Sequence, residues 1–404
     1  MGLFEQLELR GLVKQTTNTE KIRSLLNDGE VTFYIGFDPT AESLHVGHLL
    51  QLVTAQRLIE AGHNCIILIG GATAMIGDPT GKSEMRKMLS FSDVRVNSSD
   101  IETQIHKILN WPGAFTSINN MMWFSGLGFL EMLRMVGPHF SVNNMLRAEC
   151  FKSRMEHGLS FMEFNYMIMQ ATDFLKLNEW ENCTLQLGGD DQWSNILAGI
   201  DLVHKVKGKE VFGLTIPLLT NSAGQKMGKT EKGAVWLDPN KTTVFDFFQF
   251  WRNLPDADVL KCFKMLTFLS MDEINSLEMD CVGNINAAKK RLALEITKIV
   301  HGKELAEEAL KQAEALFEQQ DTSTIEAVEI DDGIQLLDLL VQNGFAKSRT
   351  DGRHLISGNG ISINDQVVSN PLLVVTRSEF GTDLTIRKGK KKFSRFTFRT
   401  NNET

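Results

Sequence analysis

Two kinds of apolar pattern alternate along the first half of the chain. Residues 31–37 (VTFYIGF) and 64–71 (NCIILIGG) are short runs rich in β-branched and aromatic side chains, which predict buried strands. Between them, residues 45–62 carry apolar side chains at i, i+3 and i+4 and end at a glycine, which predicts a helix. A strand, a helix and a second strand in this order predict a right-handed crossover and an open parallel sheet.

The alternation continues towards the middle of the chain. Residues 161–180 predict a mostly apolar helix, 184–189 a strand and 190–206 a helix, and 214–219 predict a short strand before a Gly- and Lys-rich loop. In open α/β sheets, ligands bind at the loops that follow the carboxyl ends of the strands. We therefore expect the functional residues to lie in these loops.

The remaining segments are predicted to be mainly helical. Residues 1–30 have helical spacing, and residues 241–318 show it with no strand candidate. A polar, acidic stretch follows, and the end of the chain predicts two helices, at 334–344 and 348–357, with short strands such as ISIND. The predicted division is an α/β parallel-sheet domain at 1–240, a helical domain at 241–318, a linker at 319–332 and a small α+β domain at 333–404.

The composition is ordinary for a soluble globular protein. Of the 404 residues, 42% are apolar and 23% are charged, and the length predicts more than one domain. No run of 18 uncharged apolar residues occurs and the N-terminus lacks a secretory signal, so we expect neither a membrane span nor export. The odd number of cysteines, five, without metal-ligand spacing predicts reduced thiols in a cytoplasmic protein with no bound metal.

The charge is unevenly distributed. Residues 333–404 hold 11 Lys and Arg against 6 Asp and Glu, a net of +5, so the rest of the chain must carry −13 of the total of −8. An acidic body with a basic tail indicates that a polyanion binds at one end.

The first chemical motif, DPTAESLHVGH (38–48), lies between the first strand and its helix. Free backbone N–H groups and the positive dipole end of a helix favour phosphate at this position. Thr40 and His45 can donate hydrogen bonds to phosphate oxygens, and Gly47 leaves the backbone open to a flat base. Taken alone, the same residues also fit a helix cap with two surface histidines.

Two further loops carry cations. GDPTGKSEMR (77–86) looks like a Walker phosphate loop, but the position that needs glycine is Ile76, so we reject that reading. The loop still bears Lys82 and Arg86, which suit a leaving polyphosphate. KMGKT (226–230) places two lysines three residues apart on a Gly-rich loop, although either loop alone is compatible with a solvated basic turn.

The predicted helix at 161–180 bears a polar stripe. Tyr166, Gln170 and Asp173 fall at i, i+4 and i+7 and therefore share one face. Buried polar groups need partners, so this face predicts either structural hydrogen bonds or the wall of a pocket for a small polar ligand.

In combination, these motifs resemble a known family. HxGH after the first strand and KMxKT after the last resemble the two signatures of class I aminoacyl-tRNA synthetases. The stretches YIGFDPTAESLHVGHL, IGDPTGKSEMR, YMIMQATDF, LGGDDQWSNI and KMGKT resemble the bacterial-type tyrosyl-tRNA synthetases, in that order. The resemblance implies a Rossmann-like catalytic domain, activation of L-tyrosine with ATP and Mg²⁺, transfer to the terminal adenosine of tRNA(Tyr), and a homodimer.

The resemblance also implies residue roles. Tyrosine would be held by Tyr34, Asp78, Tyr166, Gln170, Asp173 and Gln192, with Tyr34 and Asp173 at the phenol. ATP would contact Gly36, Asp38, His45, Gly47, His48, Gly189, Asp191 and Lys229. Charge on the phosphates would be stabilised by the catalytic groups Thr40, His45, His48, Lys82, Arg86, Lys226, Lys229 and Thr230.

The end of the chain resembles the S4 RNA-binding fold over LLDLLVQNGFAKSRTDGRHLISGNGISINDQVV. The implied RNA-binding residues are Lys347, Arg349, Arg353, Lys390, Lys391 and Lys392. RKGKKKFSRFTFR (387–399) adds seven basic residues and three interleaved phenylalanines, which suit phosphates and base stacking. A solubilising charge run would give the same composition.

Two positions depart from the family pattern. Position 35 is Ile, where many members have a Cys that reaches the ribose, so that contact would be missing and nucleotide binding would rest more on Gly189 and Asp191. Position 352 is Gly where the S4 motif has a better helix former, which predicts a less rigid helix.

Three other functions are compatible with parts of the pattern. A tryptophanyl-tRNA synthetase shares the fold, but the paired phenol ligands Tyr34 and Asp173 disfavour an indole, which has a donor and no acceptor. A small-molecule nucleotidyltransferase or ligase can share HxGH, although the basic S4-like tail disfavours it. An RNA-binding protein on a disused synthetase fold is disfavoured by the intact set of basic loop residues.

Overall fold

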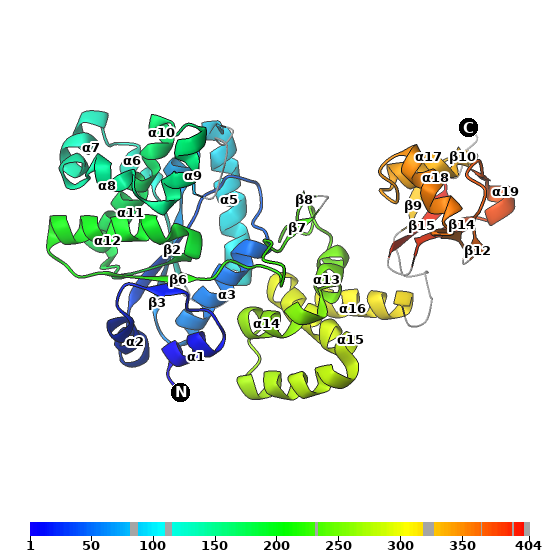
Figure 1. Cartoon of the computed structure of the whole chain (residues 1–404), viewed down its shortest axis with the longest axis horizontal. Helices are drawn as coiled ribbons and strands as arrows, with labels where there is room; N and C mark the ends of the chain where they lie inside the picture. The colour runs from blue at the N-terminus through cyan, green and yellow to red at the C-terminus, as the bar shows by residue number, and fades with distance from the viewer. Residues whose placement is uncertain are drawn as a thin grey trace. The chain divides into compact units, whose positions relative to one another are not determined.

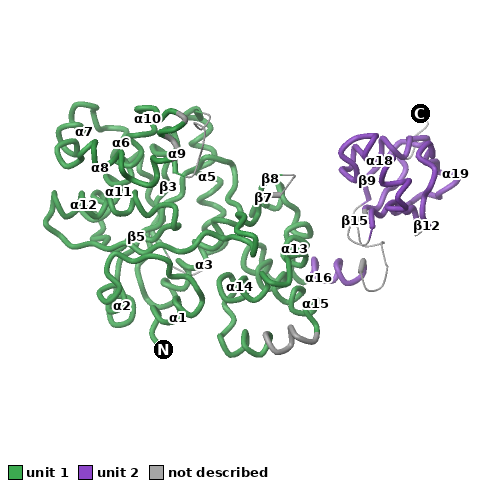
Figure 2. Tube along the Cα trace, viewed as in Figure 1, with its two compact units in different colours: residues 1–307 green, residues 308–404 purple. Residues whose placement is uncertain are grey.

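The computed structural model describes residues 1–80, 88–109, 115–230, 233–317, 327–364, 366–389 and 392–399 (Figure 1). The chain forms two compact units, residues 1–307 and 308–404, shown in green and purple in Figure 2. The division into four segments made from the sequence stays a prediction. Among the described residues, no helix is both long and apolar enough to cross a membrane.

A six-stranded sheet forms the centre of the first unit, in the order β1-β6-β5-β2-β3-β4. The strands are β1 (Gln15–Thr16), β2 (Thr32–Phe37), β3 (Asn64–Ile69), β4 (Phe115–Asn119), β5 (Leu185–Gly189) and β6 (Phe212–Ile216). All neighbours pair in parallel except β1, which runs antiparallel to β6. From β2 the chain adds β3 and β4 on one side and later β5 and β6 on the other, so the topological switch point lies between β2 and β5.

Helices pack against this sheet because its strands are apolar on both faces. Tyr34, Ile66 and Leu68 pack against Phe174 of α11 (Tyr166–Glu181) and Leu202 of α12 (Trp193–Lys207). The remaining helices before residue 230 are α1 (Leu3–Leu9), α2 (Thr19–Asp28), α3 (Val46–Glu60), α4 (Gly71–Ile76), α5 (Phe91–Ile108), α6 (Met121–Phe124), α7 (Phe129–Val136), α8 (Val142–Met145), α9 (Glu149–His157) and α10 (Phe161–Phe164), with 3₁₀ turns η1 (Gly137–His139) and η2 (Asp190–Gln192).

The helical prediction for 241–318 is confirmed over its described part. The helices are α13 (Val244–Arg252), α14 (Asp256–Leu266), α15 (Met271–His301) and α16 (Lys303–Phe317), and a small hairpin of β7 (Lys229–Thr230) and β8 (Gly233–Ala234) precedes them. Side chains from the N-terminal part of the same unit bind the turn after α14. Arg10 donates to the carbonyls of Thr267 and Leu269, and Arg57 also donates to Thr267.

Several predicted boundaries are wrong. Residues 1–30 are not continuously helical, because β1 pairs with β6 between α1 and α2. The helix predicted at 161–180 is divided at Asn165 into α10 and α11, and the side chain of Asn165 donates to the carbonyl of Phe161 at this point. The predicted linker ends in a strand, β9 (Val328–Ile330), because these residues pair in parallel with the last strand of the chain.

The second unit is an α+β fold, as the sequence predicts. Its five-stranded sheet has the order β12-β11-β14-β15-β9, and β10 pairs with β13 beside it. The remaining elements are β10 (Ile334–Gln335), α17 (Leu336–Gln342), α18 (Arg349–Ser357), β11 (Ile361–Ile363), β12 (Gln366–Val367), β13 (Val374–Val375), α19 (Arg377–Phe380), β14 (Asp383–Lys388) and β15 (Lys392–Phe398).

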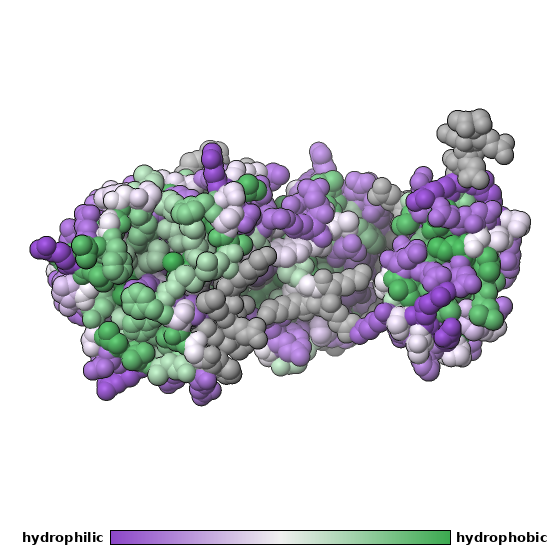
Figure 3. All heavy atoms as spheres, turned by 90° about the horizontal axis from the view of Figure 1, so that it is seen from above, coloured by the Kyte–Doolittle hydropathy of each residue, from purple (hydrophilic) through white to green (hydrophobic). Residues whose placement is uncertain are grey.

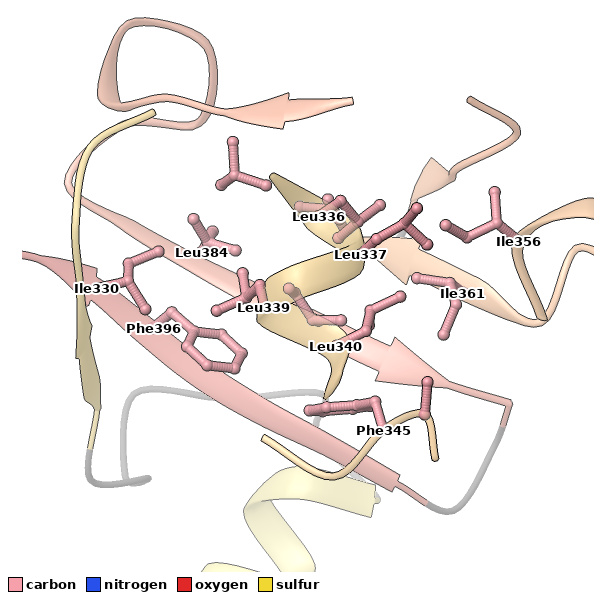
Figure 4. Close-up of a cluster of buried hydrophobic side chains, with 14 of the residues drawn as sticks. Ile330, Leu336, Leu337, Leu339, Leu340, Phe345, Ile356, Ile361, Leu384 and Phe396 are labelled. Atoms are coloured by element: carbon pink, nitrogen blue, oxygen red, sulfur yellow. The ribbon is translucent and has the colours of Figure 1, made fainter. Parts of the chain in front are cut away.

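The core of the second unit lies between α17 and the five-stranded sheet (Figure 4). Leu336, Leu337, Leu339 and Leu340 are all buried, so four of the seven residues of α17 face the core. Gly352 allows α18 to approach this helix, because a Cβ at position 352 would lie 2.9 Å from Cδ2 of Leu337. The glycine at this position therefore has a packing role.

The prediction that the tail phenylalanines stack on bases is wrong for two of the three. Phe396 and Phe398 alternate along β15 with Arg395 and Thr397, and their exposed fractions are 0% and 3%. Because strand side chains alternate between faces, the phenylalanines enter the core while Arg395 pairs with Asp383 at 3.1 Å on the outside. Apolar burial, and not stacking, explains this spacing.

We predict that Phe396→Ala destabilises the second unit by about 3–5 kcal/mol, the usual cost of removing a buried phenylalanine. Hydrogen exchange of β14 in the full chain would measure the loss. Ser394→Ala, on the same strand but not in the core, is the control. Weaker RNA binding by Phe396→Ala with unchanged exchange would instead support stacking.

Candidate functional site

A cavity of about 460 Å³ lies at the switch point of the sheet. Its walls come from the ends of β2, β3, β5 and β6, the first turn of α3, one face of α11 and the segment around 226–236. This is the place where open α/β sheets bind ligands, because the crossovers on either side diverge there.

The structure brings the sequence-predicted site residues together in this one cavity. Its lining includes Tyr34, Gly36, Asp38, Thr40, His45, Gly47, His48, Asp78, Tyr166, Gln170, Asp173, Gly189, Asp191, Gln192 and Lys226. Lys82 and Arg86 lie outside the described residues, as do Lys390 and Lys391. The backbones of Lys229, Thr230 and Lys392 are described as strand residues, but their side chains are not.

The two histidines of HVGH cap α3 together. The backbone N–H of His45 donates to Nδ1 of His48 at 3.2 Å, and the N–H of Gly47 donates to Nδ1 of His45 at 3.0 Å. The rings stack with centroids 4.0 Å apart. Because each Nδ1 accepts a hydrogen bond, each neutral ring carries its proton on Nε2, which makes that nitrogen a hydrogen-bond donor.

Gly47 makes this stacked arrangement possible. A Cβ at this position would lie 2.8 Å from Cε1 of His45, which is closer than real contacts allow. The glycine therefore makes room for the imidazole of its own motif, whatever else lies against it.

The two motifs that lie 180 residues apart in sequence meet through a shared backbone segment. Val235 accepts a hydrogen bond from the N–H of Val46 at 3.1 Å and donates to the carbonyl of Gly228 at 2.8 Å, and Leu237 donates to Leu44 at 2.8 Å. Gly228 has a φ of +80°, and a Cβ there would lie 2.1 Å from Cγ2 of Val46. HVGH and KMGKT are thus in direct contact, which only glycine permits at position 228.

Asp173 is the most deeply buried carboxylate in the cavity wall, with 2% of its surface exposed. Trp123 Nε1 donates to Oδ1 at 2.9 Å, and Asn120 Nδ2 donates to Oδ2 at 3.2 Å. Burial raises the pKa of Asp173 well above its usual value, and these two donors oppose the shift. Within the described residues, the nearby hydroxyl of Tyr34 is buried without a hydrogen-bond partner, and burial raises the pKa of Tyr34 as well.

A continuous set of hydrogen bonds leads from Asp173 to the other end of the cavity. Asn120 Nδ2 also donates to Oγ1 of Thr73 at 3.1 Å, and Thr73 donates to Oδ1 of Asp38 at 2.7 Å. The hydroxyl of Tyr166 donates to Oδ2 of Asp38 at 2.8 Å. Burial raises the pKa of Tyr166, so this hydroxyl stays protonated as the donor.

Two further pairs of polar side chains line the cavity. Gln192 Nε2 donates to Oδ2 of Asp78 at 2.6 Å, and Asn195 donates in turn to Gln192 at 3.1 Å. Asp191 forms an ion pair with Lys226 at 3.8 Å. Burial raises the pKa of Asp191, and the Lys226 cation partly offsets that shift.

The sequence analysis missed several residues of this site. Gln186 lines the cavity beside Tyr34, is 3% exposed, and has a side-chain oxygen with no partner among the described residues. Its signal was present, because a glutamine inside the buried strand TLQLGG needs an explanation. Asn120 and Trp123 gave no signal, since only the fold brings them to Asp173.

Ile35 plays a different part from the one predicted. It is buried on the face of β2 opposite to Tyr34 and is not among the residues that line the cavity. The substitution therefore changes the packing behind the sheet, and the prediction about the ribose stays untested.

Comparison with known families assigns both units. Residues 26–318 match the family model of class I tRNA synthetases (W and Y), and residues 314–396 match the tyrosine–tRNA ligase SYY-like C-terminal domain. The tyrosine–tRNA ligase of Acetivibrio thermocellus is 51% identical over 402 residues, covering 98% of each chain. That of Clostridium botulinum is 49% identical over 401 residues, again covering 98% of each chain.

Solved structures agree with the fold. A C-terminally truncated mitochondrial tyrosyl-tRNA synthetase from Aspergillus nidulans is 31% identical with a TM-score of 0.71, covering 78% of this chain and 94% of that one. A tryptophanyl-tRNA synthetase from Encephalitozoon cuniculi, with a TM-score of 0.58, covers 77% of this chain and 89% of that one, but its 13% identity shows the shared fold alone. The site geometry, the family models and the near-complete relatives agree, and the chain belongs to the tyrosine–tRNA ligases of the class I aminoacyl-tRNA synthetases.

Proposed function

We propose that this cavity holds L-tyrosine and ATP side by side, joins them as tyrosyl-adenylate, and delivers tyrosine to tRNA(Tyr). The observation that carries the proposal is the shared cavity itself. Asp173, Tyr34, His45 and Lys226 all line the same space. An acceptor suited to a phenol and donors suited to phosphates are therefore available to one pair of reactants.

The phenol end explains selection for tyrosine. The substrate hydroxyl can donate to the carboxylate of Asp173 and accept from the hydroxyl of Tyr34, whose oxygen is otherwise buried without a partner in the described structure. Phenylalanine would leave the hydroxyl of Tyr34 unpaired and would add no donor to those that Trp123 and Asn120 supply to Asp173. Tyrosine-specific synthetases are the standard example of this kind of rejection.

The other end of the amino acid is polar on all sides. Asp78, Tyr166 and Gln170 would hold its ammonium group, since they supply a carboxylate and two oxygens, and Gln192 would lie beside its carboxylate. The hydrogen bond from Gln192 to Asp78 brings these two groups to within 2.6 Å of each other, which suits one compact zwitterion. Gln170 supports this role, because its side-chain oxygen is buried without a partner in the described structure.

The nucleotide would occupy the side formed by HVGH and the β5 loop. Gly36, Asp38, Gly189 and Asp191 would contact the ribose and base, while Thr40, His45, His48 and Lys226 would meet the phosphates. Lys82, Arg86, Lys229 and Thr230, proposed from the family resemblance, would complete the set of groups around pyrophosphate. We also propose that Mg²⁺ enters with ATP and is bound mainly by phosphate oxygens and water.

The chemistry needs no protein nucleophile. The tyrosine carboxylate attacks the α-phosphorus, pyrophosphate leaves, and a hydroxyl of the tRNA terminal adenosine then attacks the mixed anhydride. Catalysis therefore comes from in-line positioning and from donors that stabilise the charge developing on the leaving group. The Nε2–H groups of His45 and His48 are suited to that task, since their caps already hold them in place.

The second unit is proposed to bind tRNA through Lys347, Arg349 and Arg353, together with Lys390, Lys391 and Lys392. Arg353 is exposed on α18, whereas Arg349 already pairs with Asp338 at 2.9 Å. Exposed cations contribute to phosphate binding without displacing an internal partner, so Arg353 is the stronger candidate of these two.

We place the enzyme in the cytoplasm, where the four described cysteines, all unpaired, would remain reduced.

A homodimer is supported by an exposed apolar patch. Met122, Phe129, Leu130, Leu133, Val142, Met155 and Phe161 are all exposed, and they come from α6 to α10. These helices are labelled together at the top of Figure 1, and the view from that side in Figure 3 shows green, apolar atoms gathered over that part of the molecule. α7 is apolar on both faces, since Val136 is buried while Phe129, Leu130 and Leu133 are exposed. Patches of this kind mark protein interfaces.

The direct test of the proposed function is ATP–pyrophosphate exchange with each of the twenty amino acids. We expect exchange with tyrosine and background rates with phenylalanine and tryptophan. Tryptophan-dependent exchange would refute the assignment of the phenol end.

Because the chain contains only two tyrosines, Tyr34 and Tyr166, labelling with 3-fluorotyrosine gives two ¹⁹F signals, and both should shift on substrate binding.

Asp173→Asn tests the buried acceptor in two ways. We expect kcat/KM for tyrosine to fall about 10- to 150-fold, the loss of one hydrogen bond to a charged group, while KM for ATP stays unchanged.

The same variant tests the effect of pH on stability. Because the pKa of Asp173 is raised in the folded state, its contribution to stability is greatest below its unfolded pKa of about 4 and declines as the pH rises. Thermal melts from pH 4 to 8 should therefore show the parent losing stability relative to the variant, and parallel curves would contradict the buried charge.

The dimer is tested by Leu130→Glu, which places a charge in the centre of the apolar patch. We expect light scattering to report a dimer for the parent and a monomer for this variant. Val367→Glu, an equally drastic change at an exposed apolar residue of the second unit, should leave the mass unchanged. A monomeric parent would remove this part of the proposal.

A further inference from the structure

We propose that Gln104 is a positioning residue for the phosphate-binding end of the site, and this inference rests on the proposed function. Gln104 lies on α5 and lines no part of the cavity. It acts through the loop between β2 and α3, which carries Thr40 and leads into His45.

The loop depends on side chains for its backbone hydrogen bonds, because residues 38–44 belong to no strand or helix. Gln104 Oε1 accepts from the N–H of Leu44 at 3.0 Å and from the hydroxyl of Ser43 at 3.1 Å. Gln104 Nε2 donates to the carbonyl of Glu42 at 3.4 Å. One side chain therefore bonds three consecutive loop residues.

Two of these bonds matter most because they satisfy groups on buried residues. Ser43 is 2% exposed and Leu44 is 1% exposed, whereas the bond to the carbonyl of Glu42 is exposed. Removing Gln104 would leave the N–H of Leu44 as an unpaired buried donor. The backbone would have to move to recover a partner, and Leu44 is covalently joined to His45.

The same helix supplies a second anchor at the other end of the loop. Asn97 is 6% exposed, and its Nδ2 donates to the carbonyl of Pro39 at 3.1 Å. Residues 97 and 104 are seven apart, two helical turns, so both face the loop from one side of α5. The helix thus holds the segment immediately before Thr40 and the segment immediately before His45.

The KMGKT side completes the support. Asp238 donates its N–H to the hydroxyl of Ser43 at 3.3 Å, and Leu237 donates to the carbonyl of Leu44 at 2.8 Å. The loop is therefore held between α5 on one side and the segment after KMGKT on the other. With Gln104 gone, the segment immediately before His45 would lose its bonds to α5 and keep those to the segment after KMGKT, and in-line phosphate chemistry is sensitive to small displacements.

The test is Gln104→Met, which keeps length and removes the acceptor and the donor. We expect kcat of tyrosine-dependent pyrophosphate exchange to fall about 10- to 100-fold per active site, with KM for tyrosine unchanged. Gln56→Met is the matched control: Gln56 is also a helical glutamine, 8% exposed, and within the described part of the chain its amide donates only to Glu60. Should Gln104→Met fold poorly, Gln104→Asn keeps the amide and withdraws it by one methylene, and the same loss is expected.

A double-mutant cycle with His45→Ala separates positioning from general destabilisation. If Gln104 acts through the motif, Gln104→Met costs little more in the His45→Ala background than His45→Ala alone. Fully additive losses, or exchange by Gln104→Met equal to the parent, would overturn the inference. Absence of tyrosine-dependent exchange in the parent would instead defeat the proposed function, so the two failures are distinguishable.

Discussion

A buried carboxylate cannot remain without donors, and the site of this protein is arranged around that requirement at Asp173. Trp123 and Asn120 supply the two donors, and Asn120 uses its second hydrogen for Thr73, which in turn serves Asp38. Each member is satisfied by the next, so the wall of the cavity is stiff before any substrate arrives. In the proposed function, specificity follows from the same arrangement, because the lone pairs of Asp173 would accept a hydrogen bond from a phenol and would gain nothing from a phenyl ring.

The wall around Asp173 is built from helix and strand residues, whereas the wall around His45 includes a loop. The loop that joins β2 to the histidine motif belongs to no strand or helix. It is held by Gln104 and Asn97 from α5 and by residues 235–238. Gly228 and Val46 touch at a distance that excludes any side chain on the glycine. HVGH and KMGKT, the two motifs proposed to bind phosphate, are therefore in contact, and a movement of one must be accommodated by the other.

In the second unit, one strand carries both buried apolar side chains and charged side chains. Along β15, phenylalanines alternate with polar residues, and the fold uses the first set for its core and the second for its surface. The basic character of this unit is thus carried by a scaffold whose stability depends on the apolar half of the same segment. A composition that reads as a nucleic-acid motif can therefore owe part of its pattern to packing.

The amino-acid sequence by itself determined the parallel sheet, the helical segment after it, and most of the site. His45, Asp173 and Lys226 could be predicted because helix caps, a polar stripe on an apolar helix and a Gly- and Lys-rich loop after a strand are local patterns with a direct physical meaning, whereas Tyr34 was implied by the family resemblance. Only the tertiary structure decided the partners of these residues. Asn120, Trp123 and Gln104 come from segments with no chemical motif of their own, and Phe396 could be assigned to the core only once β15 had paired with β14. Hydrogen bonds between residues 50 or 60 positions apart depend on the packing of whole elements, and that information is absent from any local pattern in the chain.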